Sequence, residues 1–315
     1  MTGLVAITGA TGFVGARCVH HLAAAGWRIR ILTRRMPQAA LMPDHKIEVV
    51  LGDLDDQASL RQLVAGADAI LHCAGLVKAP TPEAFFAANV GGTEHLLLAA
   101  AQAAPRARLI HISSLAAREP HLSPYAASKQ AGEIKVAGLA GPRDWITLRP
   151  PVVYGPGDHE LLPLFKAAKL GFVAYPAAPG ARVATIHVAD LAEAIVALLA
   201  APNWAERQIE IDDGATNAHD WPGILSALGK AVGRAPRAWR LPRPLLMPIA
   251  AGVTLFSHLT GQPKVLSLRK VAEIYHPDWV ARGPSLSRVA NWQPQFSLDT
   301  GFADTAAWYR SQALL

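Results

Sequence analysis

Short hydrophobic segments alternate with longer amphipathic segments through the first half of the chain. The short segments are rich in Val, Ile and Leu and are flanked by turn residues, which predicts strands at 4–8, 28–33, 47–51, 68–73, 107–112 and 144–149. The segments between them predict helices over 13–25, 56–65, 83–103 and 123–138. Strands and helices in regular alternation form a parallel sheet covered on both faces, and right-handed crossovers make the sheet doubly wound. The expected fold class is therefore α/β of the Rossmann type.

The pattern changes after residue 150, where Pro and Gly become frequent. Beyond it we predict short strands at 182–187 and 207–212, a helix at 188–201, and mostly helices from about 217 onward. With 315 residues, the chain is long enough for one large domain and a smaller partner. We expect a Rossmann domain over 1–155, to which the chain returns around 182–202. Residues 156–315 would mainly form a smaller, mostly helical lobe that binds the substrate.

A glycine-rich turn joins the first predicted strand to the first predicted helix. Residues 8–15 read TGATGFVG, with glycines at every third position from Gly9. Gly9 permits the tight turn, Gly12 lets the backbone approach a pyrophosphate, and Gly15 lets the helix pack close to the sheet. The amino end of the helix then offers free N–H groups to the phosphates. The alternative is a glycine-rich turn without a ligand. The predicted dinucleotide-binding residues of this turn are Gly9, Thr11, Gly12, Phe13 and Val14.

The residues after the second predicted strand indicate which dinucleotide is bound. NAD sites usually carry Asp or Glu there, which accepts a hydrogen bond from the ribose 2′-hydroxyl. This chain has Thr33, Arg34 and Arg35 instead. An arginine suits a 2′-phosphate, through bidentate charge-assisted hydrogen bonds. We therefore expect NADP(H) in preference to NAD(H), with Arg34 as the first candidate and Arg35 as the second. Two solvated surface arginines are the alternative interpretation.

A Tyr-x-x-x-Lys motif opens the helix predicted after the fifth strand. Tyr125 and Lys129 are four residues apart, so they share one face of that helix. A nearby ammonium lowers the pKa of a phenol from about 10, which makes Tyr125 a better proton donor or acceptor at neutral pH. Ser114 follows the fifth strand, where a hydroxyl can hold a substrate carbonyl oxygen. Ligands of open α/β sheets bind at this carboxyl edge, so the three residues are candidate catalytic groups.

Eight short motifs occur in the order and at the spacings of one enzyme family. They are GATGFVG (9–15), GDL (52–54), HCAG (72–75), ANVGGT (88–93), HISS (111–114), YAASK (125–129), LRPPVVYGPGD (148–158) and IHVAD (186–190). With these motifs the chain resembles an extended short-chain dehydrogenase/reductase (SDR) of the NAD(P)-dependent epimerase/dehydratase type. Within that family it is most similar to 3β-hydroxysteroid dehydrogenases and to keto-lipid reductases of the 3-ketoceramide type.

The resemblance implies a cofactor role for residues in several of these motifs. Asp53 and Leu54 would contact the adenine, and Ala74 and Gly75 would line the path of the ribose and phosphates. The residues expected against the nicotinamide are Pro150, Val152 and Val153.

The resemblance also implies the composition of the catalytic site. Ser114, Tyr125 and Lys129 would form the triad, with Ser113 as the alternative serine. Lys129 would also hold the nicotinamide ribose, and Asn89 would support the site through a water molecule. Relatives often dimerise through two helices of each subunit, so a homodimer is expected from the resemblance.

Two departures from the family pattern concern the substrate. Ser114 and Tyr125 are only 11 residues apart, whereas sugar-modifying relatives usually have a longer loop there. Those relatives often carry an arginine four residues before the histidine of the IHV motif, where this chain has Val183, with Arg182 beside it. Both departures argue against a nucleotide-sugar substrate. His187 of the IHV motif is expected to be structural rather than catalytic.

A basic stretch precedes an apolar one in the second half of the chain. Five residues lead directly into the apolar segment 245–259: Lys230, Arg234, Arg237, Arg240 and Arg243. Three interpretations stay open for this segment. It is a buried helix with a solvated basic approach, a lid over an apolar substrate pocket, or a membrane-surface element whose arginines meet anionic headgroups. The last interpretation gives the predicted membrane contact over 230–260.

Composition argues against several other classes of protein. Lys and Arg number 30 against 24 Asp and Glu, but no basic patch is interleaved with aromatic residues, so nucleic-acid binding is not expected. Cys18 and Cys73 form no metal-binding motif and are expected to be small buried residues. The 12 His lack ligand spacing, so no metal site is expected. No signal peptide and no apolar run of spanning length is recognised. We expect a cytoplasmic protein, with the inner face of the membrane as the place of any surface contact.

The expected function is the interconversion of a ketone and a secondary alcohol on an apolar, lipid- or steroid-like substrate with NADP(H). One alternative is a nucleotide-sugar epimerase or dehydratase, which uses the same triad. The other is a non-catalytic scaffold that holds NADPH, like the accessory subunit of respiratory complex I. The intact Ser-Tyr-Lys set argues against the scaffold, which has no use for it.

Overall fold

The computed structural model describes residues 3–37, 47–204, 207–248 and 268–315. The chain divides into two compact units. The first comprises Met1–Arg149, Leu191–Glu210 and Gly283–Trp292, and the second comprises Pro150–Asp190, Ile211–Arg282 and Gln293–Leu315.

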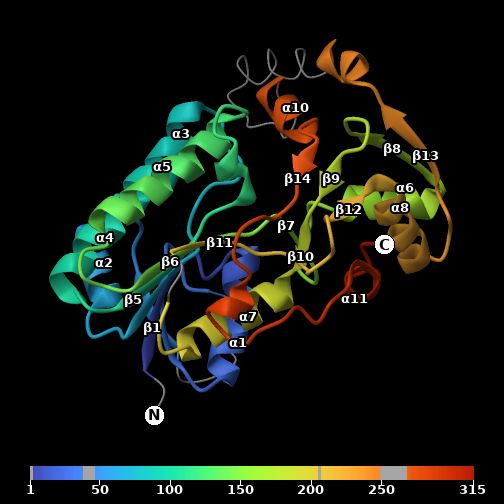
Figure 1. The fold of residues 1–315 in the computed structure, drawn as a ribbon. Coiled ribbons are helices and arrows are strands. Elements are labelled where there is room, and N and C mark those ends of the chain that lie inside the picture. Colours follow the sequence, from blue (N-terminus) through green and yellow to red (C-terminus); the bar gives the residue numbers. More distant parts are fainter. Residues whose placement is uncertain (1–2, 38–46, 205–206, 249–267) are drawn as a thin grey trace. The chain divides into compact units, whose positions relative to one another are not determined.

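The first unit is built on a seven-stranded sheet, in the order β11-β6-β5-β4-β1-β2-β3, with every neighbouring pair parallel (Figure 1). The strands are β1 (Leu4–Thr8), β2 (Arg28–Thr33), β3 (Ile47–Leu51), β4 (Ala69–His72), β5 (Arg108–Ile112), β6 (Trp145–Arg149) and β11 (Gln208–Glu210). All five residues of β1 are buried, as a central parallel strand requires. The Rossmann-type fold expected from the alternating pattern is therefore confirmed.

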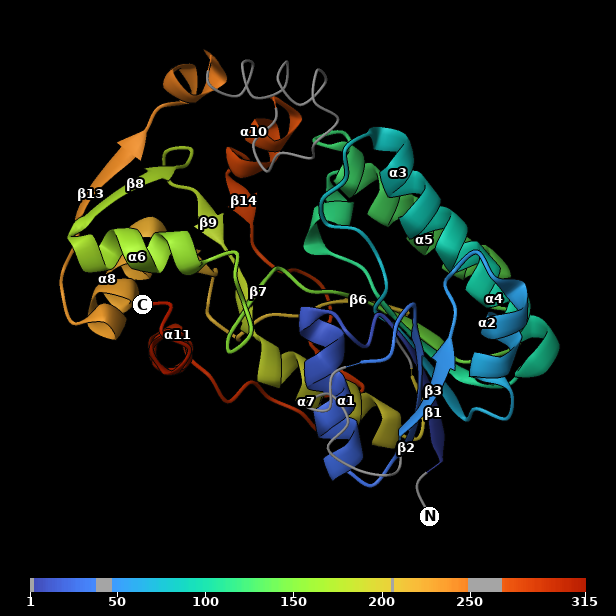
Figure 2. The ribbon, with the colours of Figure 1, turned by 180° about the vertical axis from the view of Figure 1, so that it is seen from behind.

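Helices cover both faces of this sheet (Figures 1 and 2). On one side lie α2 (Gln57–Val64), α4 (Gly92–Ala103) and α5 (Pro124–Leu139), and on the other α1 (Phe13–Ala24) and most of α7 (Val188–Ala200). The first group packs a continuous apolar core against the strands, with Leu63, Leu97 and Val136 among its buried side chains. Burial of this surface is the main force that holds the helices on the sheet.

One predicted helix has an irregular centre. The segment expected as a single helix over 83–103 consists of α3 (Pro82–Phe86), a π-helical turn at Ala87–Gly91, and α4. Apolar periodicity alone does not reveal such a turn, because it adds one residue without interrupting the helix. Turns of this kind occur frequently at functional sites.

The second unit combines small sheets with helices. Its strands are β7 (Val152–Tyr154), β8 (Phe172–Pro176), β9 (Arg182–Val183), β10 (Thr185–His187), β12 (His219–Asp220), β13 (Arg237–Leu241) and β14 (Asp278–Trp279). Its helices include α6 (Leu162–Leu170), α8 (Trp221–Val232), α10 (Leu268–Ile274) and α11 (Leu298–Ser311). Tyr154, Phe165, Phe302 and Tyr309 form the centre of its apolar core. The strands after 217 were not predicted, because their sequences, HD, RAWRL and DW, contain no apolar run.

Among the described residues, no helix is long and apolar enough to cross a membrane. The apolar segment 245–259 is described only up to residue 248. There, Leu246 is buried against Val271 and Tyr275, whereas Leu245 is exposed. The remainder, on which the choice between buried helix, lid and membrane element depends, lies outside the described residues.

The two cysteines are free thiols next to each other in the first unit. Cys18 is buried in α1, as expected, but Cys73 is only half-buried. The expectation of two buried cysteines is therefore wrong for Cys73, because this residue lies just beyond the end of β4, at the open carboxyl edge of the sheet.

Candidate active site

The glycine-rich turn between β1 and α1 forms a tight backbone loop. Gly9 has φ +72°, a left-handed conformation that favours glycine, and a Cβ there would lie 2.6 Å from the Ala74 nitrogen. The Gly12 N–H donates to the Gly9 carbonyl at 3.0 Å. A Cβ on Gly15 would collide with the Gly9 carbonyl oxygen. No side chain caps the amino end of α1, so its first N–H groups fit a pyrophosphate.

The residues expected around the adenine lie at the ends of β2 and β3. The Gly52 N–H donates to the Thr33 carbonyl at 3.0 Å, which holds the two strand ends together. Arg34 and Arg35 follow Thr33 and are exposed. Asp53 is exposed too, and its carboxylate accepts hydrogen bonds from the next turn of backbone.

Leu54, expected at the adenine as well, packs against the start of α4. A Cβ on Gly92 would lie 2.6 Å from the Leu54 Cδ1. The Leu54 side chain therefore packs directly on the backbone of α4, in a contact that only glycine allows.

The three candidate catalytic residues lie at the carboxyl edge of β5. Ser114 follows the strand, and its Oγ accepts from the Ala116 N–H at 3.2 Å. Tyr125 is in the first turn of α5, which is capped by the Ser123 hydroxyl. Lys129 lies one turn later, is buried, and donates from Nζ to the Ile112 carbonyl at 2.7 Å. This bond ties the lysine to the strand that ends beside Ser114.

The ammonium group of Lys129 is poorly solvated. Burial lowers the pKa of Lys129 to about 8, although Glu133 and Cys73 act in the opposite direction. Two stacked imidazoles lie nearby: His72 and His111 have ring centroids 5.6 Å apart. Burial, and then the Lys129 charge, lowers the pKa of His72 to about 3 and that of His111 well below its usual value. Both rings are therefore neutral at pH 7, and Lys129 is the cation of this region.

Asn89 links several of the predicted residues from within the π-helical turn. Its Oδ1 accepts from the Leu76 N–H at 2.7 Å, and its Nδ2 donates to the Leu76 carbonyl and to the Ser128 Oγ. A Cβ on Gly75 would lie 2.9 Å from the Asn89 Oδ1 and 3.7 Å from the Lys129 Nζ. Gly75, Asn89 and Lys129 therefore meet at one place, although they are far apart in the sequence.

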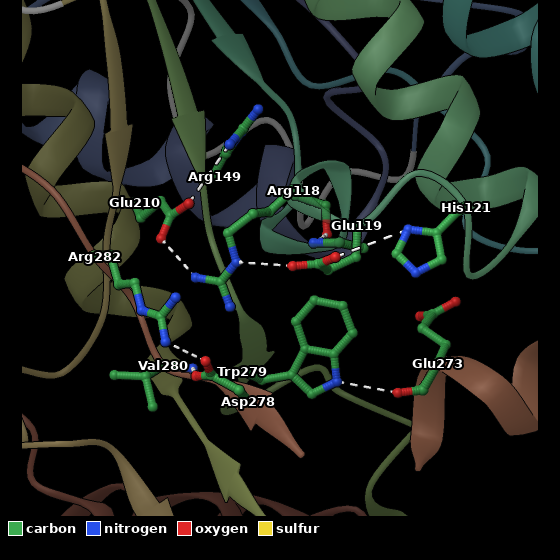
Figure 3. A network of polar contacts seen from close by, with 12 residues as sticks. Arg118, Glu119, His121, Arg149, Glu210, Glu273, Asp278, Trp279, Val280 and Arg282 are labelled. Atoms are coloured by element: carbon green, nitrogen blue, oxygen red, sulfur yellow. Dashed lines mark hydrogen bonds and ion pairs between the residues drawn. The ribbon is translucent and has the colours of Figure 1, made fainter. Parts of the chain in front are cut away.

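A buried ionic network lies behind the end of β5, and the sequence did not reveal it. Ser113 Oγ donates to Glu133 at 2.5 Å, and Arg149 binds the same carboxylate in a bidentate pair at 2.9 and 2.6 Å. Arg149 and Arg118 both reach Glu210, as Figure 3 shows. The available signal was the spacing of Glu133, which lies four residues after Lys129 on the same helix.

The remaining predicted residues belong to the second unit. Pro150, Val152 and Val153 begin that unit, and β7 pairs with β10 there. His187 is buried, with its ring stacked on Phe296 at 3.8 Å and edge-on to Tyr154. Among the described residues, no group of His, Cys, Asp or Glu could hold a metal ion.

A parallel sheet with a phosphate-type loop and a Tyr–Lys helix at its carboxyl edge defines a dinucleotide-binding enzyme of the Rossmann class. The family model for the NAD dependent epimerase/dehydratase family matches residues 5–211. The chain belongs to this family, and it is an NAD(P)-dependent oxidoreductase of the extended SDR type.

Known proteins with similar sequences or structures include two reductases and a dehydratase. A ceramide reductase of Caulobacter vibrioides is 42% identical over 316 residues, covering 99% of this chain and 96% of the relative. A 4-hydroxy-2-methyl-3-oxo-4-farnesyl-3,4-dihydroquinoline-1-oxide ketoreductase of Stigmatella aurantiaca is 31% identical over 74% of this chain and 77% of its own length. The structure of DesIV, a dTDP-glucose 4,6-dehydratase from Streptomyces venezuelae with NAD bound, has a TM-score of 0.72 at 23% identity, covering 98% and 97% of the two chains. This last likeness concerns the fold alone.

Proposed function

We propose that the chain is an NADP(H)-dependent ketoreductase that interconverts a ketone and a secondary alcohol on an apolar, lipid- or steroid-like substrate, with a ketoceramide-type ketone as the first candidate. The observation that carries the proposal is the full-length, 42% identical relative named a ceramide reductase. The second relative is named a ketoreductase, and the substrate in its name carries a farnesyl group. The bound cofactor would supply or accept the hydride.

The proposed division of roles follows from the positions at the end of β5. Tyr125 exchanges the proton with the substrate oxygen, and the Lys129 ammonium on the same helix face favours its phenolate. Ser114 holds the substrate oxygen. We assign this role to Ser114 rather than Ser113, because the Ser113 hydroxyl is buried and already donates to Glu133. Asn89 keeps the turn beside Gly75 and Lys129 in position.

The proposed cofactor site runs along the same sheet edge. Its residues are Gly9, Thr11, Gly12, Phe13 and Val14 at the pyrophosphate, Arg34 and Arg35 at the 2′-phosphate, Asp53 and Leu54 at the adenine, Ala74, Gly75, Tyr125 and Lys129 at the ribose, and Pro150, Val152 and Val153 at the nicotinamide. NADP(H) is proposed over NAD(H), because the end of β2 carries exposed arginines and no carboxylate.

Several further sequence predictions stand as proposals. Residues 1–155, with the return around 182–202, are proposed to bind the cofactor, and 156–315 mainly the substrate. We also propose a cytoplasmic homodimer that contacts the inner face of the membrane through residues within 230–260.

A nucleotide-sugar epimerase or dehydratase is the second candidate, favoured by the family description. A test that separates the two compares the wild type with Tyr125→Phe. The reductase proposal expects consumption of NADPH with a long-chain ketone of the 3-ketoceramide type. In the variant this activity should fall by at least about 100-fold, with a much smaller change in NADPH binding. Turnover of a UDP- or dTDP-sugar by protein that retains NAD, without ketone reduction, would favour the second candidate.

A further inference from the structure

The two strands β8 and β13 form a small parallel sheet in the second unit, and among the described residues α6 and α8 pack on one of its faces. Val173 is buried in the apolar core with α6 and α8, and Tyr175 stacks on Trp221 of α8 at 4.6 Å. Side chains alternate along a strand, so Phe172 and Ala174 point to the opposite face. That outer face receives no helix from α6 or α8.

The outer face presents large apolar side chains to solvent. Phe172 pairs with Arg237 and Ala174 with Trp239, so Phe172, Trp239 and Arg237 share this face. Phe172 and Trp239 are each 52% exposed. Leu170 is the last residue of α6, just before β8, and is 79% exposed. Leu245 lies shortly after β13 and is 52% exposed. Exposed apolar groups gathered in this way mark an interaction site more often than isolated ones do.

The same segments carry charge of one sign only. Residues 161–181 and 221–248 contain seven Lys or Arg and no Asp or Glu: Lys166, Lys169, Lys230, Arg234, Arg237, Arg240 and Arg243. Lys230 is paired with Asp299. Among the described residues, Arg237, Arg240 and Arg243 form no ion pair. An anionic partner would therefore meet uncompensated arginines around an apolar centre.

We propose that the outer face of β8 and β13, with Leu170, Leu245 and the surrounding arginines, is a docking surface for an anionic phospholipid bilayer. Trp239 would lie at the boundary between headgroups and acyl chains, where its amphipathic ring is favoured, and Phe172 would bury its apolar ring beside it. The arginines would remain among the anionic headgroups. The exposed leucines fit a bilayer better than a nucleic acid, and a second copy of the same cationic face would be repelled.

This surface deepens the proposed function, because a lipid-like ketone would be drawn from the bilayer to which the enzyme binds. It includes β8, which lies outside the stretch 230–260 that the sequence pattern indicated. Its binding test needs no catalytic turnover.

The experiment is flotation of the full chain with phosphatidylcholine vesicles, with and without phosphatidylglycerol at about one lipid in three. We expect binding only to the anionic vesicles, with a marked loss between about 0.1 M and about 0.5 M salt. Arg237→Glu/Arg243→Glu should weaken binding at least about tenfold, since each surface arginine contributes about fivefold. The matched control, Arg61→Glu/Arg106→Glu, makes the same charge change on exposed arginines of the first unit and should bind more than about tenfold better than that variant.

A second pair of variants tests the apolar component at constant charge. Phe172→Ala/Trp239→Ala should lose most vesicle binding, whereas Leu51→Ala/Leu98→Ala, at exposed positions of the first unit, should retain it. Reduction of a detergent-solubilised ketone is measured in parallel, so that loss of the enzyme activity and loss of membrane binding are read separately. Equal binding to both kinds of vesicle, or equal loss in variant and control, would overturn the proposal. So would dimer dissociation by Phe172→Ala/Trp239→Ala, or capture of RNA rather than vesicles.

Discussion

At the scale of single residues, the proposed chemistry requires the buried ammonium of Lys129, although burying this charge lowers the stability of the folded chain. Its ammonium is buried beside two neutral imidazoles, and it donates a hydrogen bond to the Ile112 carbonyl. A charge with so little solvation destabilises the folded chain, and active sites commonly retain such groups for function. The Tyr-x-x-x-Lys spacing was readable in the sequence, but the burial that shifts the lysine was not.

Lys129→Met should therefore abolish reduction and stabilise the cofactor-free protein. Because the folded-state pKa is lowered to about 8 from 10.5, the native state releases a proton that the unfolded chain keeps between these values, so the wild type regains stability as pH rises through that range. At pH 7 the variant should be more stable by about 1–2 kcal/mol, allowing for the lost hydrogen bond. Urea unfolding at about pH 7 and about pH 10 checks this, since the difference should shrink at the higher pH. A difference independent of pH would contradict it.

Glu133 is the second residue of interest at this scale. Its carboxylate binds Ser113 and Arg149, and its charge raises the pKa of Lys129. Glu133→Gln removes an anion that raises the pKa of Lys129, so the alkaline limb of the pH–activity profile should move to lower pH. Breaking a buried pair also costs about 3–5 kcal/mol of stability.

The control for Glu133→Gln is Glu48→Gln, which breaks the exposed pair with Arg30. That change should cost about 0–1 kcal/mol and leave the pH profile unmoved. If Glu133→Gln lowered stability but left the profile in place, the group would be purely structural.

Arg34→Ala tests the cofactor preference proposed for the end of β2. Loss of a bidentate contact to a 2′-phosphate should reduce NADPH affinity at least about tenfold, about 1.4 kcal/mol, without changing NADH affinity. Arg35→Ala is the matched comparison and should have the smaller effect. Fluorescence titration with both dinucleotides measures the ratio. Equal binding of NADH and NADPH by the wild type would refute the preference.

At the scale of elements, the strands and helices of the Rossmann sheet could be predicted because their apolar runs are long and their turns carry glycine. The strands β12 to β14 could not be predicted, because they contain no apolar run. The strands β7 and β8 were missed because they lie among prolines and glycines, which are typical of loops. The π-helical turn at Asn89 was also invisible, since it preserves the helical pattern on both sides. The sequence left open whether Ser113 or Ser114 is the catalytic serine. Our choice of Ser114 depends on the position of Glu133 in the folded chain, because its carboxylate accepts a hydrogen bond from Ser113.

The close approach of α1 to the phosphate loop gives a prediction at this scale. Gly15→Ala puts a Cβ against the Gly9 backbone, so the helix must shift and dinucleotide affinity should fall by about tenfold or more. Gly138→Ala, in α5, meets no atom within 4 Å and should instead stabilise the chain by about 0.5–1 kcal/mol. NADPH titration and thermal unfolding of both variants distinguish a packing requirement from a general intolerance of alanine. Normal NADPH binding by Gly15→Ala would contradict the account.

At the scale of the whole molecule, recognisable sequence motifs are frequent in the first unit, which we propose binds the cofactor, and rare in the second. Dinucleotide binding needs fixed backbone geometry, which leaves glycines and strand ends at set spacings. An apolar substrate needs only shape and hydrophobic contact, which many side chains provide. The outer face of β8 and β13 could not be predicted either. Its two strands are some sixty residues apart in the sequence, and no motif indicates that they pair.

The most direct measurement follows the hydride itself. The protein is incubated with a long-chain ketone of the 3-ketoceramide type and with NADPH that carries deuterium at both hydrogen positions of nicotinamide C4, and the lipid is analysed by mass spectrometry. The account predicts a secondary alcohol one mass unit heavier than the product formed with unlabelled NADPH, and no such product with Tyr125→Phe. Recovery of unchanged ketone from wild-type protein that binds NADPH and converts a nucleotide sugar would contradict it.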